Sequence, residues 1–468
     1  MLEGLILLTG VAIITISLVG LKKTRDPLFP LMILGPMLLY LYVYMPLTRV
    51  STGAIDSIFP DRDDLVITHV LNLIGVAVFC VGCIAERRPR GIDRRFELLK
   101  TQMARKTQNR MFGLGFGMGS VSNAAFFYMI QYTGGWTRVF SRAKPYLLSP
   151  SGYIGELLML SYPAAFVLAV AFQGKRLNIV RIALLLAVLF PQVVMATLGG
   201  RRGPMFLVAC TLVGCWCIIR GRLPKVKWVI TGLGAIGVLL ILLQQHRGDL
   251  FKPWAASKDV DVASSFLAPE TLTLGDEYIC AAATVQACMH HGKHHWGSRY
   301  FTIFFVRPIP KQLWPTKYSD LGMGWMDTNP GQAGFTTSEW YDAVGFVPAM
   351  GGAPGLIADL FLEFSWGVIP ACYLIGRIFS FTWRKWVFEG GIWAILYFEM
   401  MILSVFLVTQ GVGAWFYRLM IVGFLSWFLG GRNLAKGRRR PAAFQPVGQT
   451  SGSPQVRRRH AGMSTFRR

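Results

Sequence analysis

A pair of adjacent arginines lies in a short turn between two apolar stretches of membrane-spanning length. The turn, residues 199–204, reads Gly-Gly-Arg-Arg-Gly-Pro. A charge near hydrocarbon costs roughly 2.5–3.5 kcal/mol on insertion scales, so a charged residue there usually has a partner. Because the guanidinium fork matches phosphate in a bidentate manner, Arg201 and Arg202 are predicted to bind phosphate groups.

More basic residues lie in the aromatic and proline-rich stretch 296–317, which contains Arg299, Arg307, Lys311 and Lys317. Prolines fix the backbone there and stiffen the segment. Aromatic side chains beside cations are typical of the membrane–water interface. Two interpretations follow, either an interfacial anchor or a cationic wall for the phosphates of a lipid-linked ligand.

Four acidic residues are candidates for a group that removes a proton from a hydroxyl. They are Glu277, Glu339, Asp359 and Glu363. Asp359 and Glu363 are four residues apart, so both project from one helical face. Acids at that depth must face the bundle interior or a wet cavity, and an ion pair with Arg201 or Arg202 is the structural alternative.

Glu277 belongs to a predicted helix over residues 276–290. We expect Thr273 or Gly275 to cap the start of this helix and Gly292 to end it. An acid in the first turn is ordinary helix chemistry, so a structural role for Glu277 competes with a functional one.

Histidines follow at the end of the same helix, in the pattern Cys288, His290, His291, His294 and His295. Several of these spacings could suit zinc. However, Gly292 and Lys293 interrupt the helix and no acidic residue is adjacent. We therefore predict no metal site and no cofactor, and leave open a histidine that acts as acid, base or phosphate contact.

The elements that must position these residues are membrane helices. Hydrophobic residues make up 53% of the 468 residues and charged residues only 15%. About eleven apolar stretches have spanning length, roughly 2–21, 28–47, 67–85, 111–130, 153–172, 178–198, 204–219, 228–244, 354–377, 391–409 and 413–430. The predicted fold is an all-α polytopic membrane bundle. The net charge of +24 lies mostly in loops and the tail, where it meets lipid headgroups rather than nucleic acid.

Basic clusters fall on alternate sides of these stretches, which predicts the topology. The N-terminus is expected outside and the C-terminus in the cytoplasm, so the turn at 199–204 faces outward. Residues 245–353 then form a long, partly helical outer capping loop. Residues 1–431 are predicted to be one membrane domain, and residues 432–468 a disordered basic tail.

Two other patterns are given structural interpretations. Glycines at every second position from Gly113 to Gly119 lie inside a span, which favours close helix packing over nucleotide binding. The eight cysteines fall mostly in apolar stretches, so we expect no disulfide framework.

Several short motifs, taken in order, resemble the O-antigen polymerase family, the oligosaccharide repeat-unit polymerases of bacterial envelopes. They are Gly-Gly-Arg-Arg-Gly-Pro at 199–204, Gly-Asp-Glu-Tyr at 275–278, Trp-Gly-Ser-Arg-Tyr at 296–300, Arg-Pro-Ile-Pro at 307–310 with Trp-Pro-x-Lys at 314–317, and Gly355, Asp359, Glu363 and Gly367 opening a late span. The resemblance covers roughly residues 130–370.

The resemblance implies a glycosyltransferase-C-like fold in the bacterial inner membrane, with the active site on the extracytoplasmic side. The implied reaction joins oligosaccharide repeat units carried on undecaprenyl pyrophosphate, with inversion and without a metal. Arg201, Arg202 and Arg307, and less clearly Arg299, would hold the pyrophosphates. Membrane lipids and a chain-length regulator are candidate partners. The resemblance does not identify the general base.

Three rival functions remain open from the sequence. A metal-dependent transferase of polyprenyl-phosphate sugars would use acids in the first outer loop, where Asp61, Asp63 and Asp64 lie. A glycan ligase would share the donor site and differ only in its acceptor. A transporter or flippase of the same lipid-linked glycans would need alternating access and internal repeats, and no clear repeat relates the two halves.

Overall fold

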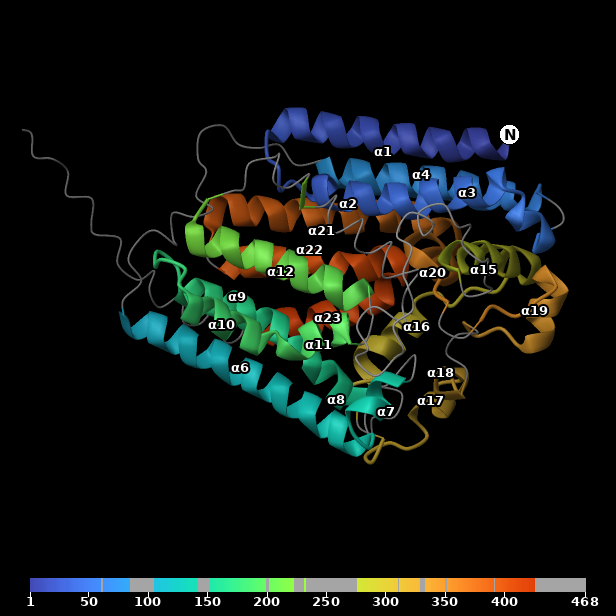
Figure 1. Ribbon diagram of the computed structural model, residues 1–468. Helices are drawn as coiled ribbons and strands as arrows, with labels where there is room; N and C mark the ends of the chain where they lie inside the picture. The colour runs from blue at the N-terminus through green and yellow to red at the C-terminus, as the bar shows by residue number, and fades with distance from the viewer. Residues whose placement is uncertain are drawn as a thin grey trace, which may run out of the picture.

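The computed structural model describes residues 1–59, 62–84, 105–141, 152–198, 202–222, 231–232, 276–309, 311–328, 333–349, 352–390 and 392–425. These residues form helices and turns and contain no strand, as the sequence predicted (Figure 1). The helices of the bundle are, in chain order, α1 (Leu2–Thr24), α2 (Pro30–Leu39), η1 (Tyr40–Tyr44), α3 (Met45–Ser51), η2 (Ala54–Ser57), α4 (Asp64–Ile84), α6 (Arg105–Tyr132), α7 (Trp136–Ser141), α8 (Gly152–Leu157), η4 (Leu158–Leu160), α9 (Ser161–Ala171), α10 (Ile179–Val188), α11 (Phe190–Thr197), α12 (Arg202–Arg220), α20 (Gly355–Phe364), η7 (Ser365–Gly367), α21 (Val368–Glu389), α22 (Ile392–Thr409) and α23 (Val412–Leu425).

Seven helical segments are long and apolar enough to cross a membrane. By the length and composition of these helices, the chain is a multi-pass membrane protein. They are Leu2–Thr24, Pro30–Ser51, Leu65–Ile84, Ile154–Ala171, Gly203–Arg220, Gly355–Glu389 and Ile392–Thr409. Helices α10 and α11, bent by 72°, make an eighth if they count as one span.

The other expected spans have different outcomes. Helix α6 covers the expected span 111–130 and runs along the bundle (Figure 1), but it is not among the apolar segments. Helix α23 is apolar but short. The expected span 228–244 lies almost wholly outside the described residues, so the total of eleven stays a prediction.

Glycines allow two close helix crossings. A Cβ on Gly376 of α21 would lie 2.3 Å from the Phe79 carbonyl oxygen of α4. On α6, a Cβ on Gly115 would lie 3.0 Å from the Ala164 carbonyl oxygen of α9. The prediction of close packing is therefore confirmed for Gly115 and also for Gly119, where a Cβ would lie 2.6 Å from the Val188 side chain of α10. A Cβ on Gly113 or Gly117 would meet nothing within 4 Å.

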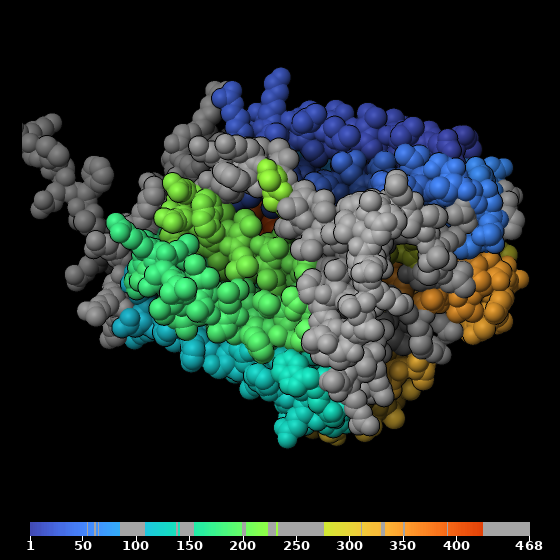
Figure 2. Space-filling model, viewed as in Figure 1, coloured from blue at the N-terminus to red at the C-terminus, as the bar shows by residue number. Residues whose placement is uncertain are grey.

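The N-terminal helices and α6 lie along opposite edges of the bundle, with α12 between them in the view of Figure 2. Helix α1 exposes a row of apolar side chains, among them Leu7, Val11, Ile14 and Leu18. Apolar side chains on the outside of a helical bundle are what a lipid environment requires.

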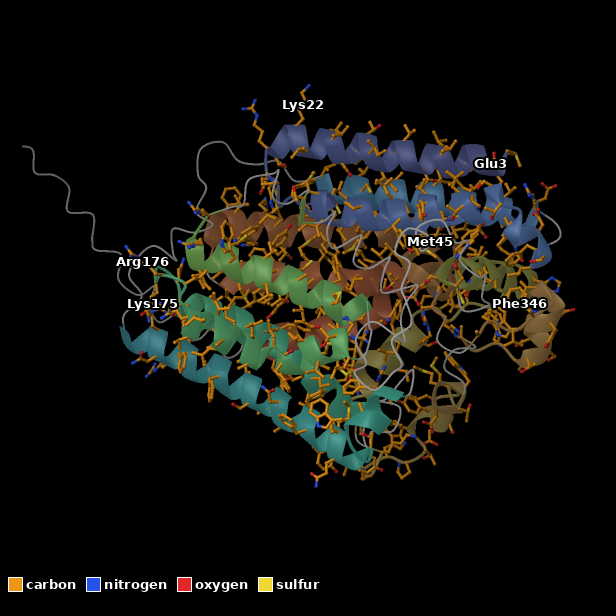
Figure 3. The ribbon with its side chains drawn as sticks, in the orientation of Figure 1. Glu3, Lys22, Met45, Lys175, Arg176 and Phe346 are labelled. Atoms are coloured by element: carbon orange, nitrogen blue, oxygen red, sulfur yellow. The ribbon has the colours of Figure 1, made fainter. Side chains whose placement is uncertain are left out.

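Two of the predicted basic loops lie at the same end of the bundle. Figure 3 shows Lys22, Lys175 and Arg176 at this end, and Glu3 and Phe346 at the other. Their shared end agrees with the alternation of basic loops along the sequence.

Five helices form a cap at the same end of the bundle as Phe346 (Figures 1 and 3). The cap comprises α15 (Glu277–His291), α16 (Ser298–Phe301) with its continuation η5 (Thr302–Val306), α17 (Lys317–Asp320), α18 (Trp325–Thr328) and α19 (Thr337–Val344). It is the described part of the predicted capping loop.

Helix α15 joins the cap to the N-terminal helices. Its N-cap is Asp276, whose side chain accepts a hydrogen bond from the Tyr278 N–H at 2.9 Å. The expectation that Thr273 or Gly275 caps this helix was therefore wrong. Arg49 of α3 donates to the same Asp276 carboxylate at 3.1 Å, and the Tyr278 hydroxyl is 2.9 Å from Nε2 of His69 on α4.

Candidate functional site

Arg299 lies in a buried ion-pair cluster between the cap and the bundle. Its Nε donates to Glu363 Oε1 at 2.5 Å, and its Nη2 donates to Asp359 Oδ1. Asp359 and Glu363 come from one face of α20, as their spacing predicted, and are 2% and 0% exposed. Their partner is Arg299, a pairing that the sequence did not predict.

The remaining oxygens of both carboxylates also have donors. The Tyr300 hydroxyl donates to Asp359 Oδ2 at 2.6 Å, and the Val412 N–H donates to the same atom at 2.8 Å. The Gly297 N–H donates to Glu363 Oε2 at 3.0 Å. Every oxygen of these two carboxylates therefore has at least one donor in the protein, and none points freely toward a substrate.

The backbone fixes this cluster as well. The N–H groups of His295 and Trp296 donate to the carbonyl oxygens of Leu362 and Glu363, at 3.0 and 2.6 Å. These bonds hold the start of α16 against the end of α20. Burial, and then the charge of Asp359, raises the pKa of the Tyr300 phenol well above its usual value, so Tyr300 remains a neutral donor. The Arg299 cluster therefore holds the cap against the bundle.

Arg307, eight residues further along, lies in a more open place. Its side chain is 45% exposed, and Nη2 is 3.9 Å from Glu156 Oε1 of α8. Its guanidinium carbon lies 4.7 Å from the centre of the Tyr417 ring of α23. Three segments distant in sequence meet here, so the fold places Glu156 and Tyr417 beside this arginine.

Lys311 and Lys317 lie in the same neighbourhood but have different roles. Burial, and then the positive charges of Lys311 and Arg307, lowers the pKa of Lys317. Lys317 is 2% exposed, and its Nζ donates to the carbonyl oxygens of Val306 and Arg307, at 3.1 and 3.0 Å, and to that of Ile309. All three ammonium donors therefore bind the backbone that carries Arg307.

Lys311 is on the surface beside this backbone clamp. Its side chain is 52% exposed, and Nζ contacts Asp327 Oδ1 at 2.5 Å. Such a pair is weak in water, so a phosphate group could compete with Asp327 for this ammonium group.

The other two acidic candidates occupy helix N-termini. Glu339 forms a capping box with Thr336 at the start of α19, and Lys293 Nζ is 3.3 Å from both its oxygens. The Thr336 N–H lowers the pKa of Glu339 most, with a smaller contribution from Lys293, which makes Glu339 a weaker base. Glu277 is the first residue of α15.

The double-arginine turn lies largely outside the described residues. Gly199, Gly200 and Arg201 are not described, and Arg202 is described only as the first residue of α12. The other end of α12 is placed by the Gly174 N–H, which donates to the Ile219 carbonyl oxygen at 3.3 Å beside the Lys175 end of the bundle. A helix of this length spans roughly 28 Å, so α12 begins at the end that carries the cap.

Each histidine of the predicted cluster has a separate partner. His294 Nδ1 is 2.9 Å from the Phe361 carbonyl oxygen, and His295 Nε2 is 2.8 Å from that of Ala333. His290 Nε2 is 3.0 Å from Asp342 Oδ2, and His291 Nε2 is 2.9 Å from the Glu339 carbonyl oxygen. Cys288 is buried and forms no disulfide, like the other cysteines.

Sequence reasoning missed Glu156, Tyr417 and Asp342. Glu156 and Tyr417 lie within or at the edge of apolar stretches far from the basic segment, and Asp342 lies 52 residues from His290. Their proximity arises only from helix packing. An acid next to an apolar stretch was the one signal that could have indicated Glu156, because such acids tend to be functional.

Comparison of the chain with protein-family models, with characterised proteins and with solved structures gave no match. The function must therefore be argued from the residues, their geometry and the resemblance of the short motifs.

Proposed function

We propose that this protein is a membrane glycosyltransferase that polymerises undecaprenyl-pyrophosphate-linked oligosaccharide repeat units on the extracytoplasmic face of the bacterial inner membrane. The observation that carries the proposal is the half-exposed Arg307, on a backbone that Lys317 holds, at the end of the bundle where α12 begins. The double-arginine turn directly precedes or opens this helix in the sequence. The motif resemblance gives the substrate class.

Transfer of a glycan from a pyrophosphate carrier depends on cations that stabilise the leaving group. When the glycosidic bond to the carrier breaks, negative charge grows on the departing pyrophosphate, and preorganised cations stabilise it. In the proposal, Arg307 and Lys311 hold one side of the pyrophosphate, and Arg201 and Arg202 the other. Lys317 fixes the Arg307 backbone, and Arg299 fixes the cap.

Arg299, like Lys317, is poorly suited to bind phosphate. With Asp359 and Glu363 ionised, its cluster carries a net charge of −1, which repels an anion. Arg307 is 45% exposed and has two lysines nearby. The exposure and the positive neighbours of Arg307 therefore suit pyrophosphate better than the closed, net negative Arg299 cluster does.

Glu156 is the base that this geometry supports best. Its side chain is 18% exposed, and no described residue donates a hydrogen bond to its carboxylate. Glu277, Glu339, Asp359 and Glu363 were the candidates from sequence, and the last three have their oxygens engaged. In the proposed step, Glu156 takes the proton of the acceptor hydroxyl as its oxygen attacks the anomeric carbon. The carbon–oxygen bond to the carrier breaks, and its electron pair leaves with the pyrophosphate.

The test is reconstitution in liposomes with labelled lipid-pyrophosphate-linked repeat units. The wild-type protein should give a ladder of products. Arg307→Ala, and Arg201→Ala or Arg202→Ala, should abolish elongation while membrane insertion is retained. Arg62→Ala is the matched control, because Arg62 is also an exposed arginine paired with an acid, Asp56 at 2.7 Å.

Glu156→Gln separates the base from the fold. It keeps the side-chain volume and should reduce turnover by about 10²–10⁴-fold, the usual contribution of a general base, with unchanged binding of the lipid-linked donor. Normal turnover in this variant would remove Glu156 from the mechanism. A single transferred product from the wild-type protein would instead identify a ligase, and relocation without new bonds a transporter.

A further inference from the structure

We propose that His290, His291 and Asp342 bind a divalent transition-metal ion of the zinc type, which fastens α15 to α19 within the cap. The site is independent of the proposed glycan chemistry. It also departs from our expectation from sequence, which found no acid adjacent to the histidines. The fold supplies that acid from a second helix.

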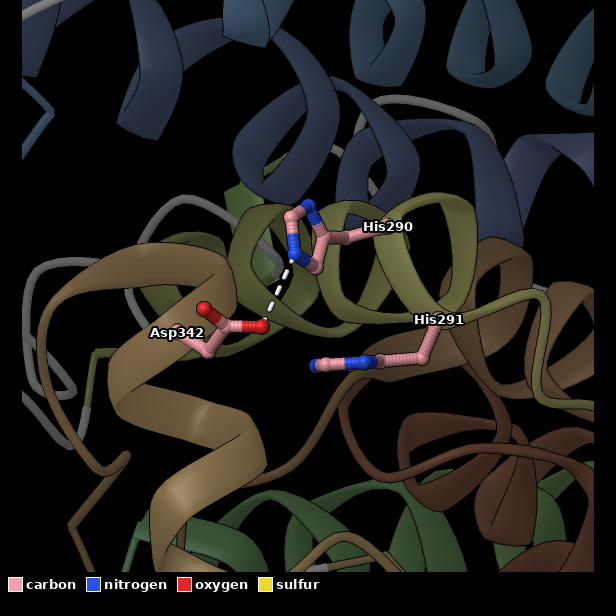
Figure 4. Close-up of side chains that lie close together, drawn as sticks. All are labelled: His290, His291 and Asp342. Carbon is pink, nitrogen blue, oxygen red and sulfur yellow. Dashed lines mark hydrogen bonds and ion pairs between the residues drawn. The ribbon is translucent and has the colours of Figure 1, made fainter.

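The three side chains already converge. Figure 4 shows His290 and His291 at the end of α15 and Asp342 on the facing α19. One ligand atom from each lies within 4.8 Å of the others, and His290 Nε2 is 3.0 Å from Asp342 Oδ2. Zinc bound to nitrogen and oxygen at about 2.0–2.2 Å needs tetrahedral ligands roughly 3.3 Å apart. The side chains would have to close by roughly 1.5 Å at most.

Exposure makes that closure inexpensive. His290 and Asp342 are 51% and 65% exposed, so both side chains have room to rotate on the solvent side. The open side also leaves room for water as a fourth ligand. Two neutral imidazoles and one carboxylate carry a net charge of −1, which attracts a dication.

His291 needs one local change. Its Nε2 is 2.9 Å from the Glu339 carbonyl oxygen, and one ring nitrogen cannot donate to that oxygen and bind a metal together. Metal binding would exchange this hydrogen bond for the metal bond, or use Nδ1 instead. The change is confined to one side chain, because Thr336 and Glu339 fix the start of α19 and the left-handed Gly292 fixes the end of α15.

The metal would add to the polar contacts between α15 and α19. These are the exposed His290–Asp342 pair, the contact of His291 with the Glu339 carbonyl oxygen and, just beyond the end of α15, the half-buried Lys293–Glu339 pair. Exposed ion pairs of this kind contribute little. A metal bond between the helices would therefore hold the cap more firmly than these pairs do.

The experiment uses the full-length protein in detergent, freed of any affinity tag and treated with EDTA. Zinc chloride should raise the thermal unfolding midpoint, and EDTA should reverse the rise. His290→Gln and Asp342→Asn should each weaken zinc affinity by tenfold or more, as measured by metal content after dialysis. His460→Ala, in the tail, is the matched control and should bind zinc as the wild type does.

Two outcomes would overturn the proposal. One is a wild-type protein that retains no zinc after dialysis and shows no shift. The other is equal zinc binding by the wild type and both variants, which would indicate an adventitious surface ion. If a variant is poorly folded, limited proteolysis of the wild-type protein with and without zinc is used instead. Zinc should protect the cap from cleavage, and equal cleavage in both conditions would count against the site.

Discussion

Two arginines of one segment, Arg299 and Arg307, are held in opposite ways. Arg299 is 13% exposed in its side chain and binds two buried carboxylates. Arg307 is 45% exposed and has one acid at 3.9 Å and an aromatic ring beneath it. The same residue type thus serves a closed ion-pair cluster at one place and an open cationic surface at the other.

The difference shows how a charged residue near a membrane can be assigned a role. A buried charge needs partners that satisfy it, and removing one partner leaves the other uncompensated. A charge that is half exposed can be reached by a ligand from solvent. Exposure, rather than residue type, separates the structural arginine from the candidate ligand.

The largest expected effect comes from breaking the closed cluster. Arg299→Met should destabilise the protein by about 3–5 kcal/mol, because it leaves Asp359 and Glu363 buried without a counter-ion. Thermal or denaturant unfolding in detergent measures this loss.

A compensated variant sharpens that result. Arg299→Met combined with Asp359→Asn and Glu363→Gln removes all three charges and should recover much of the stability, since neutral replacements of buried ion pairs are often tolerated. If Arg299→Met instead unfolds like the wild type and only weakens pyrophosphate binding, Arg299 belongs with the ligand residues and the contrast fails.

Local patterns predicted much of this molecule from sequence. The helical membrane fold, helix 276–290, the shared face of Asp359 and Glu363 and the close packing at Gly115 all follow from periodicity or short-range spacing. These features depend on neighbours within one or two helical turns, which a sequence displays directly.

The partners across the fold could not be predicted in this way. Arg299 meets Asp359 from 60 residues away, and Arg307 meets Glu156 from another helix. Lys317 was predicted to bind phosphate because the sequence shows its spacing to the other basic residues. The sequence does not show that the backbone at residues 306–309 folds around its ammonium group and accepts all three of its hydrogen bonds. The contact of Asp342 with His290 could not be predicted for the same reason, because the two residues are 52 positions apart and meet only through helix packing.

A smaller effect is expected at Lys317. Lys317→Met keeps an apolar side chain in place but leaves the carbonyl oxygens of Val306, Arg307 and Ile309 short of a donor. The loss should be about 1–3 kcal/mol, the usual cost of an unsatisfied buried polar group. Unfolding measurements give the stability, and limited proteolysis reports loosening of residues 306–309.

The conservative variant separates a structural from a ligand role at this position. Lys317→Arg keeps the charge but cannot place one ammonium among three carbonyl oxygens, so it should behave like Lys317→Met in stability. If Lys317→Arg is fully stable and Lys317→Met loses only donor binding, Lys317 contacts the phosphates directly.

The smallest effect on stability is expected at Lys311, on the open side of the comparison. Lys311→Ala removes an exposed pair with Asp327, so unfolding should change by less than about 1 kcal/mol. Donor binding should nevertheless weaken, and its dependence on salt should become shallower, because one cation fewer meets the pyrophosphate. Titration of the lipid-linked donor at two salt concentrations measures both. If Lys311→Ala loses stability but binds the donor normally, Lys311 has a structural role like that of Arg299. The proposed pyrophosphate site would then consist of Arg307, Arg201 and Arg202.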